Sequence, residues 1–376
     1  MVNFLSKFIG SKSTSVIGID IGSSAIKVVQ LKKKGGKAVL ETYGALALGP
    51  YAQKEIGQST NLQTGKIVEA LLDIMRESKV TTKRGGIALP FRSSLMSIIQ
   101  MPDVPDKELA QMMPIEARKY IPVPISEVAL DWSVIPKDKY AEEEKEGDTA
   151  FKADEVQKKF PTKDVLFVAI HNSAISKFQD IIKEADIQAK FFEIEIFSAM
   201  RSVLDQQEKA PVMIFDMGAA FTKLYIVERG TVRHSHTINR GSQDITSAIS
   251  KSLQISIDEA ERLKRGIGLA KTEDGKSVAD IVDLTLSYIF SEALRVISSY
   301  QKRYNKTIQK VVLVGGGSSL KGLKEIASNR FGSEVVLGNP FDKVETPAFI
   351  EDALRSAGPD FSVSMGIALR RLQELE

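Results

Sequence analysis

Cysteine is absent from the 376 residues of this chain. Its absence excludes disulfide bonds, thiolate catalysis and the zinc sites that thiolates build, and it is consistent with the cytosol. No apolar run reaches the ~18 residues that a transmembrane helix needs, and no signal peptide is visible. The formal net charge of +3 is too small to indicate a nucleic-acid-binding protein.

Histidine is also scarce, with three residues in the chain. His234 and His236 alternate on an expected strand, so their side chains would share one face. That spacing allows a metal pair, and a plain polar strand face is the favoured interpretation. The length predicts two or more domains, each with its own core. A composition of 43% hydrophobic and 26% charged residues is typical of a globular protein.

Two stretches of the chain, 16–29 and 212–225, repeat one pattern. Each has an apolar strand, an aspartate, a glycine two positions later, small residues, and a lysine seven positions after the aspartate. A backbone that turns sharply after a strand needs glycine, and successive small residues leave N–H groups that can point at a phosphate. The paired residues are Asp20 and Asp216, Gly22 and Gly218, and Lys27 and Lys223. The repetition favours one phosphate site between two related half-domains over two unrelated surface hairpins.

Asp20 and Asp216 are the predicted metal-holding residues of that site. An aspartate on each wall can hold a hydrated Mg²⁺, a hard cation that keeps several waters. Such an ion neutralises phosphate charge and orients a water for in-line attack. Both aspartates are therefore also candidate catalytic residues.

A third glycine turn, Gly315-Gly316-Gly317, follows a predicted buried strand and precedes a predicted helix. It matches neither the P-loop nor the G-x-G-x-x-G pattern. Its place suits a flat nucleoside that passes close to the backbone, and a plain helix-entry loop is the alternative. Glu261 and Lys264 lie three residues apart on one helical face. They are candidates to hold ribose hydroxyls, or else form a surface ion pair worth a few tenths of a kcal/mol.

The apolar periodicity predicts an α/β protein. We expect strands over 16–21, 25–31, 38–47, 86–90, 94–101, 128–135, 164–170, 231–238, 310–314 and 333–337, beside the strands of the second repeat. We expect helices over 65–79, 106–120, 172–185, 194–204, 242–253, 256–264, 277–303, 320–331 and 364–376, with a capping box at Ser256 and Glu259. The charged stretch 137–163 reads as a solvated loop. The amphipathic segment 1–10 either touches a membrane surface or packs on the domain.

In this order the motifs resemble those of the actin-like ATPase superfamily, which includes sugar kinases, seventy-kilodalton heat-shock chaperones, FtsA and PilM. The resemblance covers nearly the whole chain. The matching segments are Ile17–Lys27 and Phe215–Lys223 for the two phosphate motifs, Val311–Ser319 and Glu261–Lys264 for the adenosine contacts, and Ile194–Leu204 and Ser364–Ala368 for the two connecting helices. It implies two related half-domains around a nucleotide cleft, 1–206 and 207–376. The first would carry an inserted α/β subdomain at about 91–185, and the second a helical subdomain at about 241–305.

ATP and Mg²⁺ are the cofactors that this resemblance implies. The nucleotide-binding residues it implies are Gly22, Ser23, Ser24, Lys27, Gly218, Ala219, Thr222, Lys223, Gly241, Glu261, Lys264, Gly315, Gly316, Gly317 and Ser319. A Glu or Gln of the first connecting helix often orients the attacking water in this family. Glu195 is the candidate catalytic residue, although Glu193 is also near and the sequence does not decide which faces the cleft. Because Ala219-Ala220 replaces the common Gly-Gly, ATP binding with slow turnover is expected.

The inserted segment resembles the FtsA and PilM branches, and 114–124 followed by 128–132 resembles PilM, the cytoplasmic actin-like component of type IV pilus assembly. This implies a partner, the N-terminal tail of a PilN-like inner-membrane protein, in a groove beside the insert. Candidate wall residues are Ile115, Tyr120, Ile121 and Trp132, for which subdomain core is the alternative. Other pilus platform proteins, homo-oligomers and an indirect association with the inner face of the cytoplasmic membrane are further expectations.

Two other functions are compatible with the same motifs. The first is an FtsA-like filament protein of cell division. The charged helix expected over 365–376 favours PilM over FtsA, which usually ends in a linker and an amphipathic membrane helix. The second is a small-molecule kinase of the superfamily, which would need a general base beside an acceptor pocket, and the sequence offers no clear candidate for that base.

Overall fold

The computed structural model describes residues 15–136, 161–270, 272, 275 and 277–375. The chain forms two compact units. The first combines Met1–Pro90 with Lys177–Glu376, and the second is Phe91–Ser176. The amphipathic segment 1–10 and most of the charged stretch 137–163 lie outside the described residues.

The first sheet of the larger unit has the strand order β3-β2-β1-β4-β8. Its strands are β1 (Ser15–Ile21), β2 (Ala25–Lys34), β3 (Lys37–Ala47), β4 (Arg84–Leu89) and β8 (Gln188–Ile194). The first three form the expected antiparallel meander, whereas β4 runs parallel to β1 and β8 parallel to β4. Every residue of β1 is buried, as expected for a central strand covered on both faces. Helix α1 (Thr64–Glu77) packs on β2 and β3.

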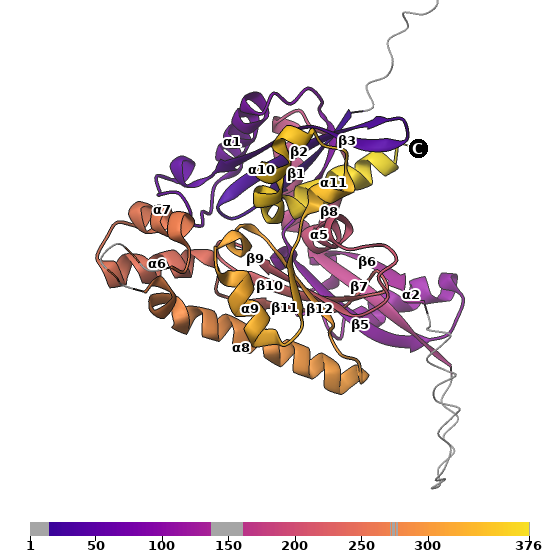
Figure 1. Cartoon of the computed structure of the whole chain (residues 1–376). Coiled ribbons are helices and arrows are strands. Elements are labelled where there is room, and N and C mark those ends of the chain that lie inside the picture. Colours follow the sequence, from indigo (N-terminus) through magenta and orange to yellow (C-terminus); the bar gives the residue numbers. More distant parts are fainter. Residues whose placement is uncertain (1–14, 137–160, 271, 273–274, 276, 376) are drawn as a thin grey trace, which may run out of the picture. The chain divides into compact units, whose positions relative to one another are not determined.

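The second sheet repeats this topology with the order β11-β10-β9-β12-β13. Its strands are β9 (Val212–Met217), β10 (Thr222–Glu228), β11 (Thr231–Ile238), β12 (Lys310–Val314) and β13 (Glu334–Leu337). Helices α6 (Ser242–Leu253), α7 (Ile257–Ile267), α8 (Val278–Tyr304) and α9 (Leu323–Phe331) accompany it, and α8 runs along the sheet (Figure 1). Phe215, Phe290 and Phe331 form an aromatic group in the core between sheet and helices. Counted along the chain, both sheets therefore have the strand order 3-2-1-4-5.

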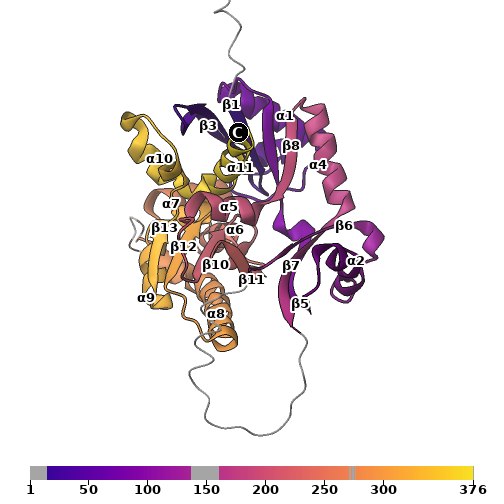
Figure 2. The same cartoon turned by 90° about the vertical axis from the view of Figure 1, so that its right-hand side faces the viewer.

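Helices α5 (Glu195–Val203) and α11 (Ser362–Gln373) pack against each other (Figure 2). Glycine makes the contact close, because a Cβ on Gly366 would lie 1.9 Å from the Ser198 carbonyl oxygen. A Cβ on Gly18 of β1 would lie 2.0 Å from the Ser364 carbonyl oxygen. Helix α11 thus lies directly on β1, so the last part of the chain packs on the first sheet.

The second unit is a small sheet with one helix on its core face. Strands β5 (Ser94–Pro102), β6 (Val128–Val134) and β7 (Thr162–His171) pair antiparallel in the order β5-β7-β6. Helix α2 (Asp106–Ala117) buries Leu109 and Met113 against Ile99 and Phe167. The next helix, α4 (Asn172–Glu184), begins here and continues into the first unit.

Most expected elements are present, and the differences have local causes. The capping box of α7 is confirmed, because the Ser256 hydroxyl accepts from the Glu259 N–H while the Glu259 carboxylate accepts from the Ser256 N–H. Strand β8 was not predicted, since it is half-exposed and lacks a clear alternation. The short helix α10 (Glu351–Ala357) was also missed. Within the described residues, no helix is long and apolar enough to cross a membrane.

Candidate functional site

Two hairpins bring four charged side chains together as matching pairs. Asp20 on β1 lies opposite Lys27 on β2, and Asp216 on β9 lies opposite Lys223 on β10. Residues that pair directly in an antiparallel ladder project on the same face of the sheet. The repeat in the sequence is therefore a repeat of two Asp–Lys pairs in space, and both aspartates are buried.

The two lysines hold their carboxylates differently. The Lys223 Nζ lies 2.7 Å from Asp216 Oδ2 and 2.6 Å from Glu195 Oε2. The Lys27 Nζ lies 3.9 Å from Asp20 Oδ2 and also 3.9 Å from Asp360 Oδ1. Lys223 thus makes charge-assisted hydrogen bonds, whereas Lys27 compensates Asp20 only by longer-range attraction.

Asp20 has a perturbed pKa, chiefly because its carboxyl is buried. Burial, together with the nearby charges of Glu195 and Asp216, raises the pKa of Asp20 to about 6, although Lys27 and Lys223 oppose the shift. Burial disfavours the charged forms of both lysines, but the surrounding carboxylates outweigh it and raise the pKa of Lys27 and of Lys223. Near neutral pH the cluster therefore contains two ammonium groups and at least one carboxylate that is costly to keep ionised.

Matching hydrogen bonds close the two turns. The Gly22 N–H donates to the Ala25 carbonyl at 3.0 Å, and the Gly218 N–H donates to the Phe221 carbonyl at 2.9 Å. These two N–H groups therefore stabilise the turns and do not point outward at an anion. The residues left to form a phosphate nest are the half-buried Ser23, Ser24 and Ala219.

Thr222 and Gly241 lie next to the second turn, where the chain enters α6. The Thr222 hydroxyl is fully buried and donates to the Arg240 carbonyl at 2.9 Å. A Cβ on Gly241 would lie 2.4 Å from the Ala219 carbonyl oxygen, so only glycine fits there. The first residues of α6 then donate to the Gly218 and Ala219 carbonyls. Gly241 thus lies against the backbone of the turn, whereas Thr222 holds the residue that precedes Gly241.

The third glycine turn contacts the same cluster. Gly315 has φ +81°, and a Cβ there would lie 2.5 Å from Asp216 Oδ1. A Cβ on Gly316 would meet Asp360 Oδ1 at 2.4 Å, and one on Gly317 would meet the Met217 side chain. The turn thus packs against the second hairpin and against Asp360, and it leads into α9. Ser319 at its end is exposed.

Glu261 and Lys264 form a buried ion pair, so the expectation of a surface pair is wrong. Lys264 Nζ lies 2.6 Å from Glu261 Oε2, and the two side chains are 9% and 5% exposed. Thr246 donates to the same carboxylate at 2.7 Å, and Arg265 Nε lies 2.7 Å from its other oxygen. Sequence spacing places the two residues on one helical face but cannot show that α6 covers that face.

Glu193 and Glu195 contact different partners. Glu193 accepts from both guanidinium nitrogens of Arg201 at 2.6 and 2.7 Å and from Arg370 at 2.8 Å. Burial opposes its ionisation, but these contacts outweigh it and lower the pKa of Glu193. Glu195 instead contacts Lys223 in the cluster. Of the two, Glu195 is therefore the one near Asp20 and Asp216. The sequence alone did not decide between Glu193 and Glu195.

Two residues of the site were missed by the sequence reasoning. Asp360 reaches Lys27 from a short helical turn at Gly358–Phe361, and no local pattern signals this long-range contact. Tyr225 follows Lys223 on β10, and strand alternation could have placed it on the same face as the cluster.

The described residues contain no group of three or more His, Asp or Glu side chains that could hold a metal ion. His236 Nε2 lies 3.5 Å from Glu292 Oε2, which agrees with the interpretation of His234 and His236 as a polar strand face. A hydrated Mg²⁺ does not need such a cage, because it is commonly held by one or two carboxylates, water and phosphate. Asp20 and Asp216 fit that requirement.

The partner residues proposed for the second unit differ in exposure. Ile115 on α2 is 72% exposed and Tyr120 is 47% exposed. Ile121 is buried in the core, and Trp132 on β6 packs against that core. Ile115 and Tyr120 are therefore accessible to a partner, whereas Ile121 chiefly supports the unit.

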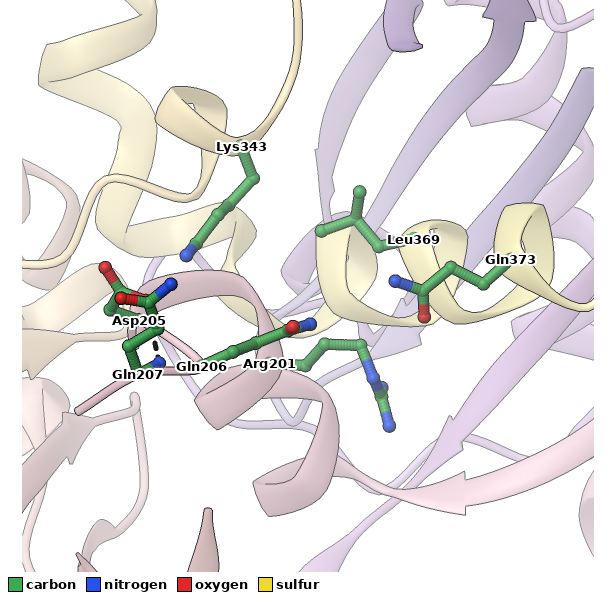
Figure 3. Close-up of a pocket in the computed structure, with 7 residues that line it drawn as sticks. All are labelled: Arg201, Asp205, Gln206, Gln207, Lys343, Leu369 and Gln373. Atoms are coloured by element: carbon green, nitrogen blue, oxygen red, sulfur yellow. Dashed lines mark hydrogen bonds between the residues drawn. The ribbon is translucent and has the colours of Figure 1, made fainter. Parts of the chain in front are cut away.

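A polar cavity of about 330 Å³ lies at the far end of α5 from Glu195. Arg201, Asp205, Gln206, Gln207, Lys343, Leu369 and Gln373 line it. Figure 3 shows the Arg201 guanidinium turned away from Lys343, because Glu193 holds it. The cavity is distinct from the carboxylate cluster.

Comparison with known proteins places the chain in a defined group. The family described as "Type IV pilus assembly protein PilM" matches residues 18–372. Among solved structures, the "PilM-PilN type IV pilus biogenesis complex" is similar with a TM-score of 0.77 and 22% identity, covering 95% of this chain and 98% of that one. MreB5 of Spiroplasma citri bound to ADP is similar with a TM-score of 0.52 and 13% identity, covering 96% and 98%. These structures show an actin-like ATPase fold.

Among curated proteins, the cell division protein FtsA of Neisseria meningitidis is 25% identical over 206 residues. The match covers 47% of this chain and 50% of that protein. The chain therefore spans about half the length of this relative, and the similarity is to part of FtsA.

Proposed function

The chain belongs to the PilM family of type IV pilus assembly proteins, and we propose that it is the ATP-binding, actin-like scaffold of the platform that assembles such pili at the inner membrane. The main support for this proposal is the pair of Asp–Lys hairpins, which the fold brings together with Glu195 and the Gly315 turn. Two carboxylates, two lysines and a glycine turn on one site suit a nucleotide whose phosphates arrive with a divalent cation.

In this proposal each residue has a defined task. Asp20 and Asp216 face the hydrated Mg²⁺, which when bound neutralises phosphate charge. Lys27, whose ammonium is 3.9 Å from its carboxylates, is the cation with room to reach a phosphate. Lys223 already holds Asp216 and Glu195. Because Lys223 already occupies the Glu195 carboxylate, that carboxylate would be less available to orient a water, and hydrolysis would be slow.

Calorimetric titration with ATP tests the site. The wild-type protein should bind ATP in the presence of Mg²⁺, and Asp216→Ala should abolish most of that heat. Asp352→Ala is the matched control, because Asp352 is an exposed aspartate on α10. A wild-type protein without affinity for ATP, or an Asp216→Ala protein with full affinity, would contradict the assignment.

The partner we propose is the N-terminal tail of a PilN-like membrane protein, bound on the cytoplasmic side. The similarity to a PilM–PilN complex supports this choice, and Ile115 and Tyr120 offer exposed apolar surface for it. Through this tail the protein would reach the inner face of the membrane and the other platform proteins.

Fluorescence anisotropy with a labelled tail peptide tests the partner. Ile115→Ser should weaken peptide binding about 10-fold, the effect of ~1.4 kcal/mol. Leu284→Ser is the control, because Leu284 on α8 is 84% exposed but belongs to the other unit. Equal peptide affinity in both variants and the wild type would exclude Ile115 from the binding surface.

The similarity to FtsA favours one second candidate, a self-assembling actin-like filament or homo-oligomer. Sedimentation of the full chain with ATP and Mg²⁺ distinguishes a filament or homo-oligomer from a monomer. Pelleting that depends on nucleotide would support the filament, and a monomer under all conditions would exclude it.

A further inference from the structure

The β2–β3 hairpin ends in a run of lysines that its turn does not need. Its tip is Lys32-Lys33-Lys34-Gly35-Gly36-Lys37, and the two glycines have φ of +59° and +82°. The equivalent hairpin of the second sheet, β10–β11, turns at Arg229 and Gly230, with φ of +51° and +72°. Positive φ at both central positions is what a tight two-residue hairpin turn requires. Because the second hairpin meets this requirement without a lysine run, the lysines of the first need another explanation.

Further cations lie at the same end of the first sheet. Ser15, the first residue of β1, pairs with Lys32 at the end of the hairpin. The segment between α1 and β4 runs beside Ser15, because the Thr82 hydroxyl donates to the Ser15 carbonyl at 3.2 Å. This segment and the first residue of β4 carry the exposed cations Lys79, Lys83 and Arg84. The end of the sheet that lies away from the Asp20 turn is therefore rich in positive charge.

Nearby carboxylates balance only part of this charge. The ion pairs are Lys32 with Glu41, Lys37 with Glu345, and Lys83 with Asp186. The side chains of Lys34 and Lys79 are exposed and have no ion-pair partner among the residues that the structure describes. Both ammonium groups are therefore available to an anionic surface.

The segment 1–14 joins the domain at this same end, because Ser15 begins β1. The structure does not describe this segment, but its sequence combines apolar residues at the spacing i, i+1, i+4 and i+5 with lysines. The apolar residues are Phe4, Leu5, Phe8 and Ile9, and the lysines are Lys7 and Lys12. Such a combination is typical of segments that lie in the interface of a membrane.

We propose that the basic end of the first sheet, together with segment 1–14, binds directly to the surface of an anionic lipid bilayer. Each lysine or arginine close to such a surface strengthens binding about 5-fold, and the apolar residues add the burial that an interfacial segment needs. A nucleic acid or an acidic protein would use the lysines but would leave the apolar residues without a role. This contact goes beyond the proposed function, because it needs neither the nucleotide nor the PilN-like tail.

Co-sedimentation of the intact chain with lipid vesicles tests the proposal, with no ATP and no tail peptide present. The probes are vesicles of phosphatidylcholine alone and vesicles that also contain phosphatidylglycerol. The wild type should bind only the anionic vesicles, and added salt should weaken this binding. A variant with Lys34→Gln and Lys79→Gln should bind them about 30-fold more weakly, because two cations are removed.

A variant with Lys302→Gln and Lys324→Gln is the matched control. Both lysines are exposed, on α8 and α9 beside the second sheet. The control loses the same formal charge from another part of the unit, so it should bind the anionic vesicles as the wild type does.

A variant with Phe4→Ser and Phe8→Ser tests the apolar part of the contact. Its affinity for the anionic vesicles should fall about 10-fold or more, because less apolar surface enters the interface. All the variants change exposed lysines or residues of segment 1–14, so their melting temperatures should equal that of the wild type.

Three outcomes would overturn the proposal. The first is a wild type that binds neither kind of vesicle. The second is an equal loss in the two lysine variants, because the charge would then act without regard to its place. The third is full affinity in the phenylalanine variant, which would make the lysines a site for a nucleic acid or an acidic protein. None of these results bears on ATP or tail binding, which the variant with Lys34→Gln and Lys79→Gln should retain in calorimetry and anisotropy.

Discussion

Asp20 and Asp216 occupy equivalent positions in two hairpins, yet their neighbours give them different electrostatic roles. Asp216 is held at hydrogen-bond distance by Lys223, and Asp20 is 3.9 Å from Lys27. Asp20 is therefore the carboxylate whose charge is least compensated, and a bound cation would compensate it most. Sequence alone could predict the pairs from their matching offsets. It could not predict the asymmetry, because Glu195 and Asp360 join the pairs only through the tertiary fold.

Asp20→Asn should stabilise the unliganded protein and weaken Mg²⁺-dependent ATP binding. Because burial raises the Asp20 pKa from 3.8 to about 6, ionising it costs folding free energy that grows as the pH rises from about 4 to about 6 and stays constant above that range. The asparagine avoids this cost, so the gain should be on the order of 2 kcal/mol at pH 7.5 and should vanish near pH 4. Urea unfolding across this range measures it. Asp352→Asn, exposed on α10, should show no such pH-dependent gain, and a gain that persists at pH 4 would contradict the assigned cause.

Glu193→Gln and Glu195→Gln should have different consequences although the residues are two positions apart. Glu193 compensates Arg201 and Arg370, so its neutralisation should lower the free energy of unfolding by about 2 kcal/mol or more, even though both arginines are partly exposed. Glu195→Gln should change unfolding by less than about 1 kcal/mol and act on nucleotide turnover. Urea unfolding and ATP hydrolysis assays on both variants check this. Similar unfolding free energies would show that Glu193 is not the structural residue of the two.

At the scale of elements, helices and strands with a strong local sequence pattern were predictable. Elements and contacts that depend on the tertiary structure were not. The hairpins of β1–β2 and β9–β10 combine apolar strands with a glycine turn, so periodicity and turn chemistry agree. Strand β8 is missed because its exposed edge and two adjacent aromatic residues give no clean alternation. The sequence also placed the final helix in the second half of the chain, but not its close packing on β1 in the first sheet.

Gly366→Ala should strongly destabilise the protein by forcing α5 and α11 apart. The added Cβ would lie 1.9 Å from the Ser198 carbonyl oxygen, a backbone atom that cannot rotate away. We expect a loss of about 3 kcal/mol or more, at the upper end of overpacking effects. Gly65→Ala is the control, because Gly65 is in α1 with nothing within 4 Å of its Cβ position, and alanine should be neutral or slightly stabilising there. Thermal unfolding of both variants decides, and equal melting temperatures would contradict the close packing.

Across the larger unit, the segment Glu55–Thr60 links its two sheets. The Thr60 N–H donates to the Ser23 carbonyl at 2.8 Å, and the Ser59 N–H donates to Gln243 Oε1 on α6 at 3.0 Å. Gly57 has φ +89° and lies against the Glu261 carboxylate of α7. No periodicity marks such a loop, so its contacts were not predictable from the sequence. It connects the first turn of the candidate site to the buried Glu261–Lys264 pair.

Gln243→Ala should loosen this linking segment without unfolding the protein. One neutral hydrogen bond contributes about 1 kcal/mol, so the amides of residues 57–60 should exchange about 5-fold faster, while those of β1 and β9 stay protected. Because the segment bridges the two sides of the site, ATP should also associate and dissociate faster, with a smaller change in affinity. Hydrogen exchange and stopped-flow binding measure both effects. Gln206→Ala, in the exposed turn after α5, should leave them unchanged. Unaltered exchange at Ser59 in Gln243→Ala would mean that the segment is held by its own backbone and does not control access to the site.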